Sequence, residues 1–520
     1  MIPDYLHVGS HLDLEGRDRW IYRSFEMLPG ILTWSTLLGV IFFSYAWPVG
    51  VAIFIILFDL YWLIKTFYFS LHLRANWKHL LKNINTDWEE RMKNLKWDHL
   101  WQLVILPVYK EPTDLLSETF EAMLLTKWPK EKMIIVLAME ERAGEDARRV
   151  SEEIRKRYEK KFGKFLITFH PDGLEGEIPG KGSNVTWAAR RVKEEIIDRD
   201  LIFYENILTS SFDIDTQVYP QYFLCLAYHF LTAEKPHRSS YQPIPIYNNN
   251  IWRAPALSRV VATSGTFWQM MQQERPERLT TFSSHSMSFK MLVEVGFWQR
   301  NIVSEDSRIF WNALLFYNSD YKVIPLSYPV FLDANIGKNS FHTAKQVYKQ
   351  QRRWTWGVEN IPYLLFGLYK NKNFPLKKKI SYIAFQIEGF WSLATNPILI
   401  FILGWLPLFL GGEQFNTMLL SYNLPRITRT LMTIAMLGLI WSAIISSSLL
   451  PPRPQDKKCY KWVGMILQWI LIPVTIIFFG SIPGVDAQTR LMLGKPLGFW
   501  VTPKGRQINS KLKNSPPEAA

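Results

Sequence analysis

Asp213 and Asp215 are two carboxylates that stand close enough in the chain to share a cation. They occur in the segment Phe212-Asp-Ile-Asp-Thr216, shortly after the apolar pair Ile207-Leu208. Side chains two positions apart on an extended segment point to the same face, so the two carboxylates could face one ion. Carboxylate oxygens suit Mg²⁺ or Mn²⁺ when a diphosphate completes the coordination shell. The alternative interpretation is an ordinary acidic pair on the surface.

A second acidic pair, Glu305 and Asp306, opens an amphipathic helical pattern within the segment Val303–Phe310. A carboxylate at this position could act as a general base that takes a proton from a hydroxyl group. Two acidic residues at a helix start can also do no more than stabilise the helix dipole. The pattern by itself leaves both interpretations open.

Gln350, Arg353 and Trp354 have the most specific spacing in the chain. On a helix they fall at i, i+3 and i+4, and therefore on one face. A guanidinium group binds phosphate in a bidentate manner, and an indole ring packs on the apolar face of a sugar. The set predicts a site for a diphosphate and a sugar ring. A basic, aromatic helix on a membrane surface is the competing interpretation.

Three further segments carry weaker signals. Pro-flanked Leu106–Pro112 follows an apolar run, and Phe499–Lys504 is a short β-prone segment with a lysine. The segment Gly176–Gly182 has one residue too few for a P-loop and lacks the hydroxyl that binds Mg²⁺, so a Walker site is excluded.

The elements that must position these residues alternate between strand and helix. Apolar runs predict strands, charged amphipathic runs predict helices, and this alternation indicates a parallel sheet with crossover helices. Ligands bind such sheets at the carboxyl ends of the strands. The long stretch Thr232–Thr281 shows no clear period and is assigned only to loop and interfacial segments. The expected strands are Leu103–Val108, Met133–Met139 and Phe165–Phe169, with helices at Leu116–Leu125 and Asp146–Lys161.

The apolar residues of the 520-residue chain gather in blocks. With 20% charged residues the chain is not made of membrane helices alone, and with 22 Trp and 33 Phe it is not disordered. Two Cys exclude a disulfide scaffold. Runs of 20 or more apolar residues are long enough to cross a bilayer as helices. The blocks are Met27–Trp47, Pro48–Leu71, Ile380–Leu410, Leu431–Leu450 and Val463–Ile482.

Basic residues predict which segments face the cytoplasm. They flank the first two apolar runs, so those runs form a hairpin and the region from about 73 to 379 is cytoplasmic. A cytoplasmic tail is also expected, because Lys495 and Lys504 lie in it. This requires that Val463–Ile482 is re-entrant, or that Ile380–Leu410 crosses twice or lies partly in the interface. Within the second run, Asp59 and Lys65 require at least one polar partner.

Taken together and in this order, the motifs resemble those of membrane-embedded family-2 glycosyltransferases of the cellulose-synthase and hyaluronan-synthase branch. The family's QxxRW motif is similar to Gln350, Arg353 and Trp354, and its FxVTxK motif to the segment Phe499–Lys504. The resemblance implies an α/β cytoplasmic domain of the glycosyltransferase A type, with a mixed, mostly parallel sheet, inserted between α-helical transmembrane segments.

The resemblance also implies a role for each matching residue. Pro107, Tyr109, Glu111 and Glu140 would contact the nucleotide, and Lys181 and Asn184 would belong to the donor site. Asp213 and Asp215 would hold the diphosphate through Mg²⁺ or Mn²⁺, and Asp306, beside Glu305, would be the base. Gln350 and Arg353 would clamp the diphosphate, Trp354 and His285 would bind the acceptor, and Thr502 and Lys504 would close over the nucleotide.

The implied reaction is inverting, metal-dependent transfer of a sugar from a nucleotide-diphosphate sugar to a hydroxyl of a growing polysaccharide, coupled to its translocation. Two alternatives stay open: transfer of one sugar to a lipid-linked or protein acceptor, and a membrane transporter or scaffold with a nucleotide-binding domain. The net charge of +14 is assigned to contacts with membrane lipids, so no nucleic-acid partner is expected; the oligomeric state is left open.

The expected segments are a cytoplasmic N-terminal segment (1–26), a transmembrane hairpin (27–72), a cytoplasmic catalytic domain (73–358), interfacial and transmembrane helices (359–482) and a cytoplasmic tail similar to a gating loop (483–520). An integral protein of the cell membrane is the expected location.

Overall fold

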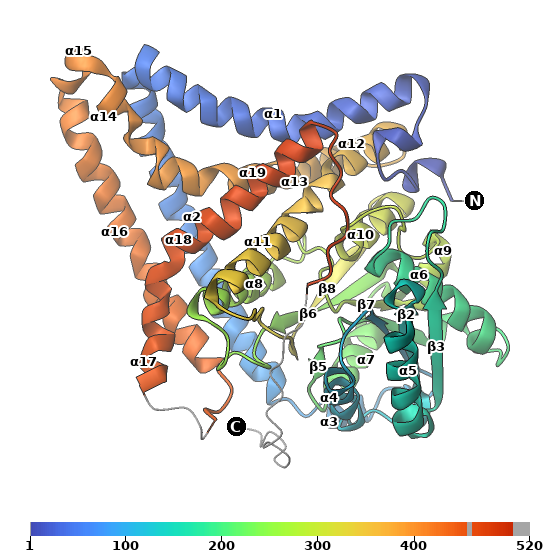
Figure 1. The fold of residues 1–520 in the computed structure, drawn as a ribbon. Coiled ribbons are helices and arrows are strands. Elements are labelled where there is room, and N and C mark those ends of the chain that lie inside the picture. Colours follow the sequence, from blue (N-terminus) through green and yellow to red (C-terminus); the bar gives the residue numbers. More distant parts are fainter. Residues whose placement is uncertain (1, 455–459, 503–520) are drawn as a thin grey trace.

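The computed structural model describes residues 2–454 and 460–502 and consists of an α/β domain beside a group of long helices (Figure 1). The sheet of the α/β domain has eight strands in the order β3-β2-β1-β4-β7-β6-β8-β5. Four of the seven neighbouring pairs are parallel, which makes the sheet mixed and mostly parallel, as expected. The strands are β1 (Trp101–Val108), β2 (Met133–Glu140), β3 (Lys164–His170), β4 (Ile207–Ser211), β5 (Gln217–Val218), β6 (Ser239–Ile246), β7 (Ser286–Ser288) and β8 (Lys322–Phe331).

Helices cover the sheet and join its strands. They are α3 (Trp88–Met92), α4 (Thr113–Leu124), α5 (Glu145–Tyr158), α6 (Lys181–Val192), α7 (Tyr222–Thr232), α8 (Ala256–Gln273), α9 (Phe289–Val295), α10 (Glu305–Phe316), α11 (Ser340–Thr355) and α12 (Asn360–Lys370). The expected strand–helix alternation at the start of the domain is confirmed as β1, α4, β2, α5 and β3.

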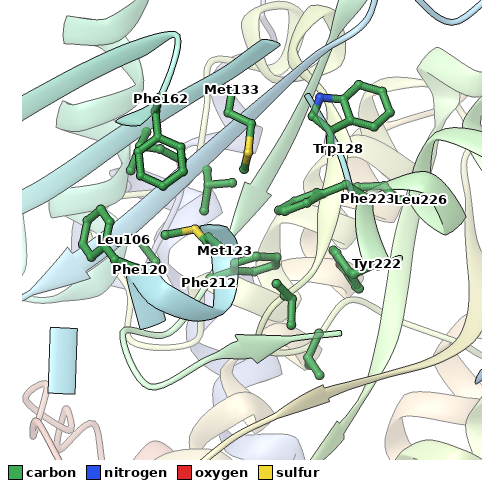
Figure 2. Close-up of a cluster of buried hydrophobic side chains, with 14 of the residues drawn as sticks. Leu106, Phe120, Met123, Trp128, Met133, Phe162, Phe212, Tyr222, Phe223 and Leu226 are labelled. Atoms are coloured by element: carbon green, nitrogen blue, oxygen red, sulfur yellow. The ribbon is translucent and has the colours of Figure 1, made fainter. Parts of the chain in front are cut away.

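Two hydrophobic cores lie on opposite faces of the central strands. In β1, Val104 and Leu106 join one core, whereas Leu103 and Ile105 join the other. The first core contains side chains from α4, α5 and α7, and Figure 2 shows a part of it around Phe120, Phe212 and Phe223. Because β1 and β2 are buried on both faces, they read as continuous apolar runs, which is typical of parallel strands between helices.

The structure places β6 and α8 in Thr232–Thr281, where the sequence predicts only loop and interfacial segments. The prediction missed β6 because Pro243 and Pro245 interrupt it, and a proline in a run normally indicates an edge strand or none. In the structure β6 is an inner strand, and its register against β8 shifts between Gln242 and Ile244. The shift accommodates prolines that cannot donate to a regular ladder.

The apolar blocks form helices long enough to cross a membrane. Among the described residues, four helices qualify by length and composition, at Gly16–Ala46, Pro48–Ile84, Leu419–Ser448 and Val463–Met492, and a helix pair bent by 47° at Leu376–Phe401 and Leu403–Leu410 also qualifies. All five expected runs therefore lie in helices. The elements are α1 (Gly16–Ala46), α2 (Pro48–Ile84), α13 (Leu376–Phe401), α14 (Leu406–Leu410), α15 (Gly412–Asn416), α16 (Leu419–Ser448), α17 (Tyr460–Leu467), α18 (Ile472–Ile476) and α19 (Ile482–Met492).

Lys65 on α2 has the polar partner that its apolar surroundings require. Its ammonium group forms an ion pair with Glu388 on α13, which is the one charge within the expected run Ile380–Leu410. The same ammonium lies 4.8 Å from the Trp62 ring centroid. A charge that is paired in this way is tolerated between apolar helices.

The helical row from α17 to α19 contacts the α/β domain at both ends. Near its start, Arg259 on α8 donates to Gln468 at 2.6 Å. Near its end, Arg352 on α11 pairs with Asp486 at 3.0 Å. The row also contacts α1, where Thr33 donates to Gln488 at 2.7 Å. Although the row is apolar enough to cross a membrane, it runs along the α/β domain (Figure 1).

Candidate active site

The ends of β2 and β3 form a small hollow beside the segment Leu106–Pro112. Arg142, just after β2, forms an ion pair with Glu140 and lies over the Tyr109 ring at 4.4 Å. The hollow is lined by Glu140, Arg142, His170 and Glu177, among others. Glu111 does not line it; its carboxylate accepts a hydrogen bond of 2.8 Å from the Tyr109 amide and so shapes the turn after β1.

Lys181 at the start of α6 joins the two acidic motifs. Its ammonium nitrogen lies 2.7 Å from Asp213 Oδ1 and 2.9 Å from Asp306 Oδ2. Glu305 Oε1 is 3.9 Å away. Burial alone would lower the pKa of Lys181, but the charges of Asp213, Asp306 and Glu305 raise it well above its usual value. Two carboxylates that the sequence separates widely thus face one cationic group.

A turn directly after β4 positions the Asp213–Asp215 motif. The Thr216 amide donates to the Asp213 carbonyl at 2.9 Å, which closes the turn. The Asp213 side chain is 32% exposed and also accepts a 2.6 Å hydrogen bond from Ser283. Asp215 is fully buried, and its Oδ2 accepts from the Asp333 amide at 2.9 Å. In the structure a turn, and not an extended segment, carries the two aspartates.

The donor set at this turn fits a hard divalent cation. Within the part of the chain that the structure describes, no group of three His, Cys, Asp or Glu side chains is arranged to hold a metal ion. Mg²⁺ commonly binds through one or two carboxylates and completes its shell with substrate phosphates and water. Asp213 and Asp215 would supply that smaller set, so an ion here would require the diphosphate as a further ligand.

His285 lies behind Asp306 and is fully buried. Its Nε2 is 3.3 Å from the indole nitrogen of Trp298, which can only donate, so the imidazole proton is on Nδ1. That Nδ1 donates to the Phe282 carbonyl at 2.8 Å and is 3.6 Å from Asp306. Burial lowers the pKa of His285, which agrees with a neutral ring. The structure therefore places this residue behind Asp306 and not where an acceptor could touch it.

Glu305 is buried next to Asp306. Burial, followed by the charge of Asp306, raises the pKa of Glu305 to about 8, although Lys181 and Arg353 oppose the rise. At neutral pH Glu305 is therefore largely protonated, and Asp306, with 22% of its side chain exposed, is the carboxylate that a substrate could reach.

This shifted pKa predicts a pH dependence of stability. Between the ordinary value of 4.5 and about 8, the folded protein keeps a proton that the unfolded chain has lost. The free energy of unfolding should then fall as pH rises through this window and level off above it. Melting temperatures from pH 5 to 9 should fall less steeply in Glu305→Gln than in the wild type. Equal slopes of melting temperature against pH in the two proteins would contradict the raised pKa of Glu305.

Helix α11 brings Gln350, Arg353 and Trp354 to the same site, as their spacing predicts. The Trp354 ring packs against Tyr247 at 6.2 Å and against Phe282 at 5.8 Å, measured between ring centroids. Gln350 lines a second hollow together with Trp354. Phe282 is followed in the chain by Ser283, whose hydroxyl donates to Asp213. The Trp354 indole packs against Phe282 and therefore lies beside the acidic motifs.

The tail also reaches the site. The Phe499 ring lies 5.1 Å from the Arg353 guanidinium and directly against Gly180, where a Cβ atom would come within 2.6 Å of the ring. Only a residue without a side chain permits this close approach. Thr502 is buried, and its hydroxyl has no partner among residues 2–454 and 460–502. Lys504 lies outside the described residues.

Asn184 and Pro107 occupy supporting positions. The Asn184 amide is fully buried and donates to the Ala138 carbonyl at 2.7 Å, which ties α6 to the end of β2. Pro107 is part of β1 and half-buried. Sequence reasoning missed Arg142, His170 and Ser283, because an arginine, a histidine or a serine outside a motif gives no signal of its own.

The structure combines a mixed α/β sheet, two acidic motifs that meet at Lys181, and helices long and apolar enough to cross a membrane at both ends of the chain. Residues 211–482 match the model of the glycosyl transferase family group 2, which is more than half of the chain, so the chain belongs to this family. The finer likeness to cellulose and hyaluronan synthases is not part of that match.

The solved structures that are similar to this one include two glycosyltransferases with a bound nucleotide sugar. The mannosyltransferase PcManGT from Pyrobaculum calidifontis, in complex with GDP-Man and Mn²⁺, shares 12% identity over 75% of this chain and 98% of its own, with a TM-score of 0.41. TarS 1–349 from S. aureus, in complex with UDP-GlcNAc, shares 11% identity over 68% and 93%, with a TM-score of 0.35. A search of curated proteins finds no match to this sequence.

Proposed function

We propose that this protein transfers a sugar from a nucleotide-diphosphate sugar to a hydroxyl group of a glycan at the membrane, with inversion at the anomeric carbon. The observation that carries the proposal is the convergence of Asp213 and Asp306 on Lys181, at 2.7 and 2.9 Å. A donor-binding carboxylate and a general base belong to one site only when they lie this close. Membership in the glycosyl transferase family group 2 agrees with this chemistry.

The donor nucleotide would extend from the hollow at the ends of β2 and β3 towards Asp213. In that hollow Nη2 of Arg142 is buried and has no partner among the residues that the structure describes, so it can donate to a nucleobase. Arg353 and Lys181 would contribute positive charge beside the diphosphate. Mg²⁺ or Mn²⁺ held by Asp213 and Asp215 would neutralise the charge that develops on the leaving diphosphate.

The transfer requires one base and one displacement. Asp306 takes the proton from the acceptor hydroxyl, whose oxygen attacks the anomeric carbon. The new bond between carbon and oxygen forms as the bond to the diphosphate breaks, and the nucleoside diphosphate leaves with the electron pair. Lys181 holds the Asp306 carboxylate from the protein side. A single displacement inverts the configuration.

We expect the catalytic domain, the start of α1 and the tail to face the cytoplasm. The turn between α1 and α2 lies next to α14, because a Cβ atom on Gly411 would be 2.9 Å from Pro48. The row α17–α19 contacts the catalytic domain at Gln468 and again at Asp486. Both contacts support a re-entrant row that returns the tail to the catalytic side. Polymer elongation coupled to passage through the helices is the mode that we expect.

A screen of nucleotide sugars with the detergent-purified protein tests the proposal. Formation of a polymer would support processive elongation, whereas a product with one added sugar would support transfer to a lipid-linked or protein acceptor. Release of nucleoside diphosphate should depend on the donor offered. If no nucleotide sugar were consumed, a transporter or scaffold with a nucleotide-binding domain would be the better interpretation.

Asp215→Asn should weaken donor binding only in the presence of a divalent cation. The amide keeps an oxygen that can accept from the Asp333 amide, so the turn should stay intact, but it loses the charge that binds the ion. We expect the Kd of the nucleoside diphosphate, measured by calorimetry with Mn²⁺, to rise about tenfold. In EDTA the variant and the wild type should bind equally. Asp320→Asn, in a surface ion pair, is the matched control.

A further inference from the structure

Glu359 is a buried carboxylate that belongs to none of the motifs. It ends the short 3₁₀ helix Trp356–Glu359, which joins α11 to α12, and only 7% of it is exposed. Its Oε1 accepts hydrogen bonds from the Val303 amide at 3.1 Å, the Ser304 amide at 2.8 Å and the Ser304 hydroxyl at 2.7 Å. Its Oε2 accepts from the Trp356 indole nitrogen at 2.8 Å. One side chain thus bridges the start of α10 and the end of α11.

The start of α10 depends on Glu359 for its cap. Ser304 is the residue before the helix, where a serine hydroxyl normally accepts a hydrogen bond from a helix amide. Within the described residues, the Ser304 side chain makes no such bond and donates to Glu359 instead. Asp306, the proposed base, is the second residue of α10. The backbone that leads into Asp306 is therefore held by a residue from another part of the chain.

Contacts on the other side of Asp306 come from the same place. Asn360, the next residue after Glu359, donates to the Ser307 hydroxyl at 2.9 Å and accepts from Arg308 Nε at 2.6 Å. Arg308 also donates to the Glu359 carbonyl at 3.1 Å. The stretch that contains Asp306 is therefore held on both sides of that residue by two neighbours in the chain.

The other end of the bridge is fixed to the helix that carries Arg353. Trp356 lies three residues after Arg353 and is 4% exposed. Its ring belongs to a buried cluster with Val303 and with Ala487 of α19. The indole is thus fixed by packing as well as by its hydrogen bond to Glu359.

We propose that Glu359 is a positioning residue, which keeps the base Asp306 at a fixed distance from Arg353. The inference rests on the proposed function. In a single displacement the acceptor hydroxyl and the leaving diphosphate lie on opposite sides of the anomeric carbon, so the base and the group that binds the diphosphate must keep their separation. A misplacement of about 1 Å can cost about a hundredfold in rate. The bridge formed by the Glu359 carboxylate prevents such a misplacement.

Glu359→Gln removes one end of this bridge. A glutamine side chain has one oxygen, so it cannot accept from both Ser304 and Trp356. We expect kcat for sugar transfer to fall about a hundredfold. The donor KM and the Kd of the nucleoside diphosphate should stay unchanged, because the alignment of the base is affected and the binding of the donor is not. Glu26→Gln, at a buried and hydrogen-bonded glutamate on α1, is the matched control; it should lower the melting temperature and keep the wild-type kcat.

A pair of variants at Ser304 tests the bridge without changing a charge. Valine and threonine have the same shape, but threonine keeps the hydroxyl that donates to Glu359. Ser304→Val should lower kcat about tenfold, whereas Ser304→Thr should retain it. Trp356→Phe, which removes the indole N–H, should lower kcat less in Ser304→Val than in the wild type, because both changes act through Glu359.

Three results would overturn the inference: a wild-type kcat in Glu359→Gln, equal kcat values in Ser304→Val and Ser304→Thr, or an equal loss of kcat in Glu26→Gln. If Glu359→Gln does not fold, the two Ser304 variants decide the question. Failure of the proposed function would look different, because the wild type itself would consume no nucleotide sugar. Coupling between Ser304 and Trp356 would then remain only in the melting temperatures, and Glu359 would be a structural residue.

Discussion

Asp306→Asn should reduce sugar transfer by about a thousandfold or more while the protein still binds its nucleotide. An amide of the same size cannot take the proton of the acceptor hydroxyl, and a general base contributes about 10²–10⁴-fold to a rate. Lys181 keeps its 2.7 Å contact with Asp213, so the donor side of the site should remain in place. The measurement is the initial rate of transfer, together with the Kd of the nucleoside diphosphate.

Two control variants show whether the loss of transfer is specific to Asp306. Asp320→Asn removes a carboxylate from a surface ion pair and should leave the rate within a factor of two of the wild type. Glu305→Gln should retain far more activity than Asp306→Asn, because Glu305 is buried and largely protonated. Near-normal turnover by Asp306→Asn would assign the base to another residue.

Lys181→Met should have the second largest effect, on both stability and rate. Methionine fills a similar volume but leaves Asp213 and Asp306 facing each other without the cation between them. Breaking a fully buried ion pair costs about 3–5 kcal/mol. Here the two aspartate side chains are 32% and 22% exposed, so we expect a loss of about 2 kcal/mol in the free energy of unfolding. Transfer should fall about a hundredfold, because positive charge beside the diphosphate is lost.

Denaturant unfolding and initial rates measure these two effects. Lys290→Met is the matched control, since it breaks an exposed pair with Glu205 that is worth less than about 1 kcal/mol. Added Mn²⁺ should recover part of the lost stability of Lys181→Met, because a cation that binds the folded state alone stabilises it. A variant as stable and as active as Lys290→Met would show that Lys181 has no part in the site.

The sequence predicted those features that depend on local patterns. Continuous apolar runs identified β1 and β2, because both strands are buried on both faces, and uninterrupted apolar runs identified the long helices. The i, i+3, i+4 spacing placed Gln350, Arg353 and Trp354 on one side of α11. The prediction of strands from the sequence failed at β6. Two prolines interrupt the side-chain pattern there, and the strand is held by neighbours that are distant in the chain.

The sequence alone determined which residues could do chemistry and that apolar helices flank an α/β domain. Only the tertiary structure decided what surrounds those residues. Lys181 and Asp306 are 125 positions apart, and Ser283 and Asp213 are 70 apart, yet both pairs form direct contacts. Contacts of this kind depend on strand order and on how helices pack, neither of which leaves a periodic trace in the sequence. For the same reason the position of His285 behind Asp306 emerged only with the fold.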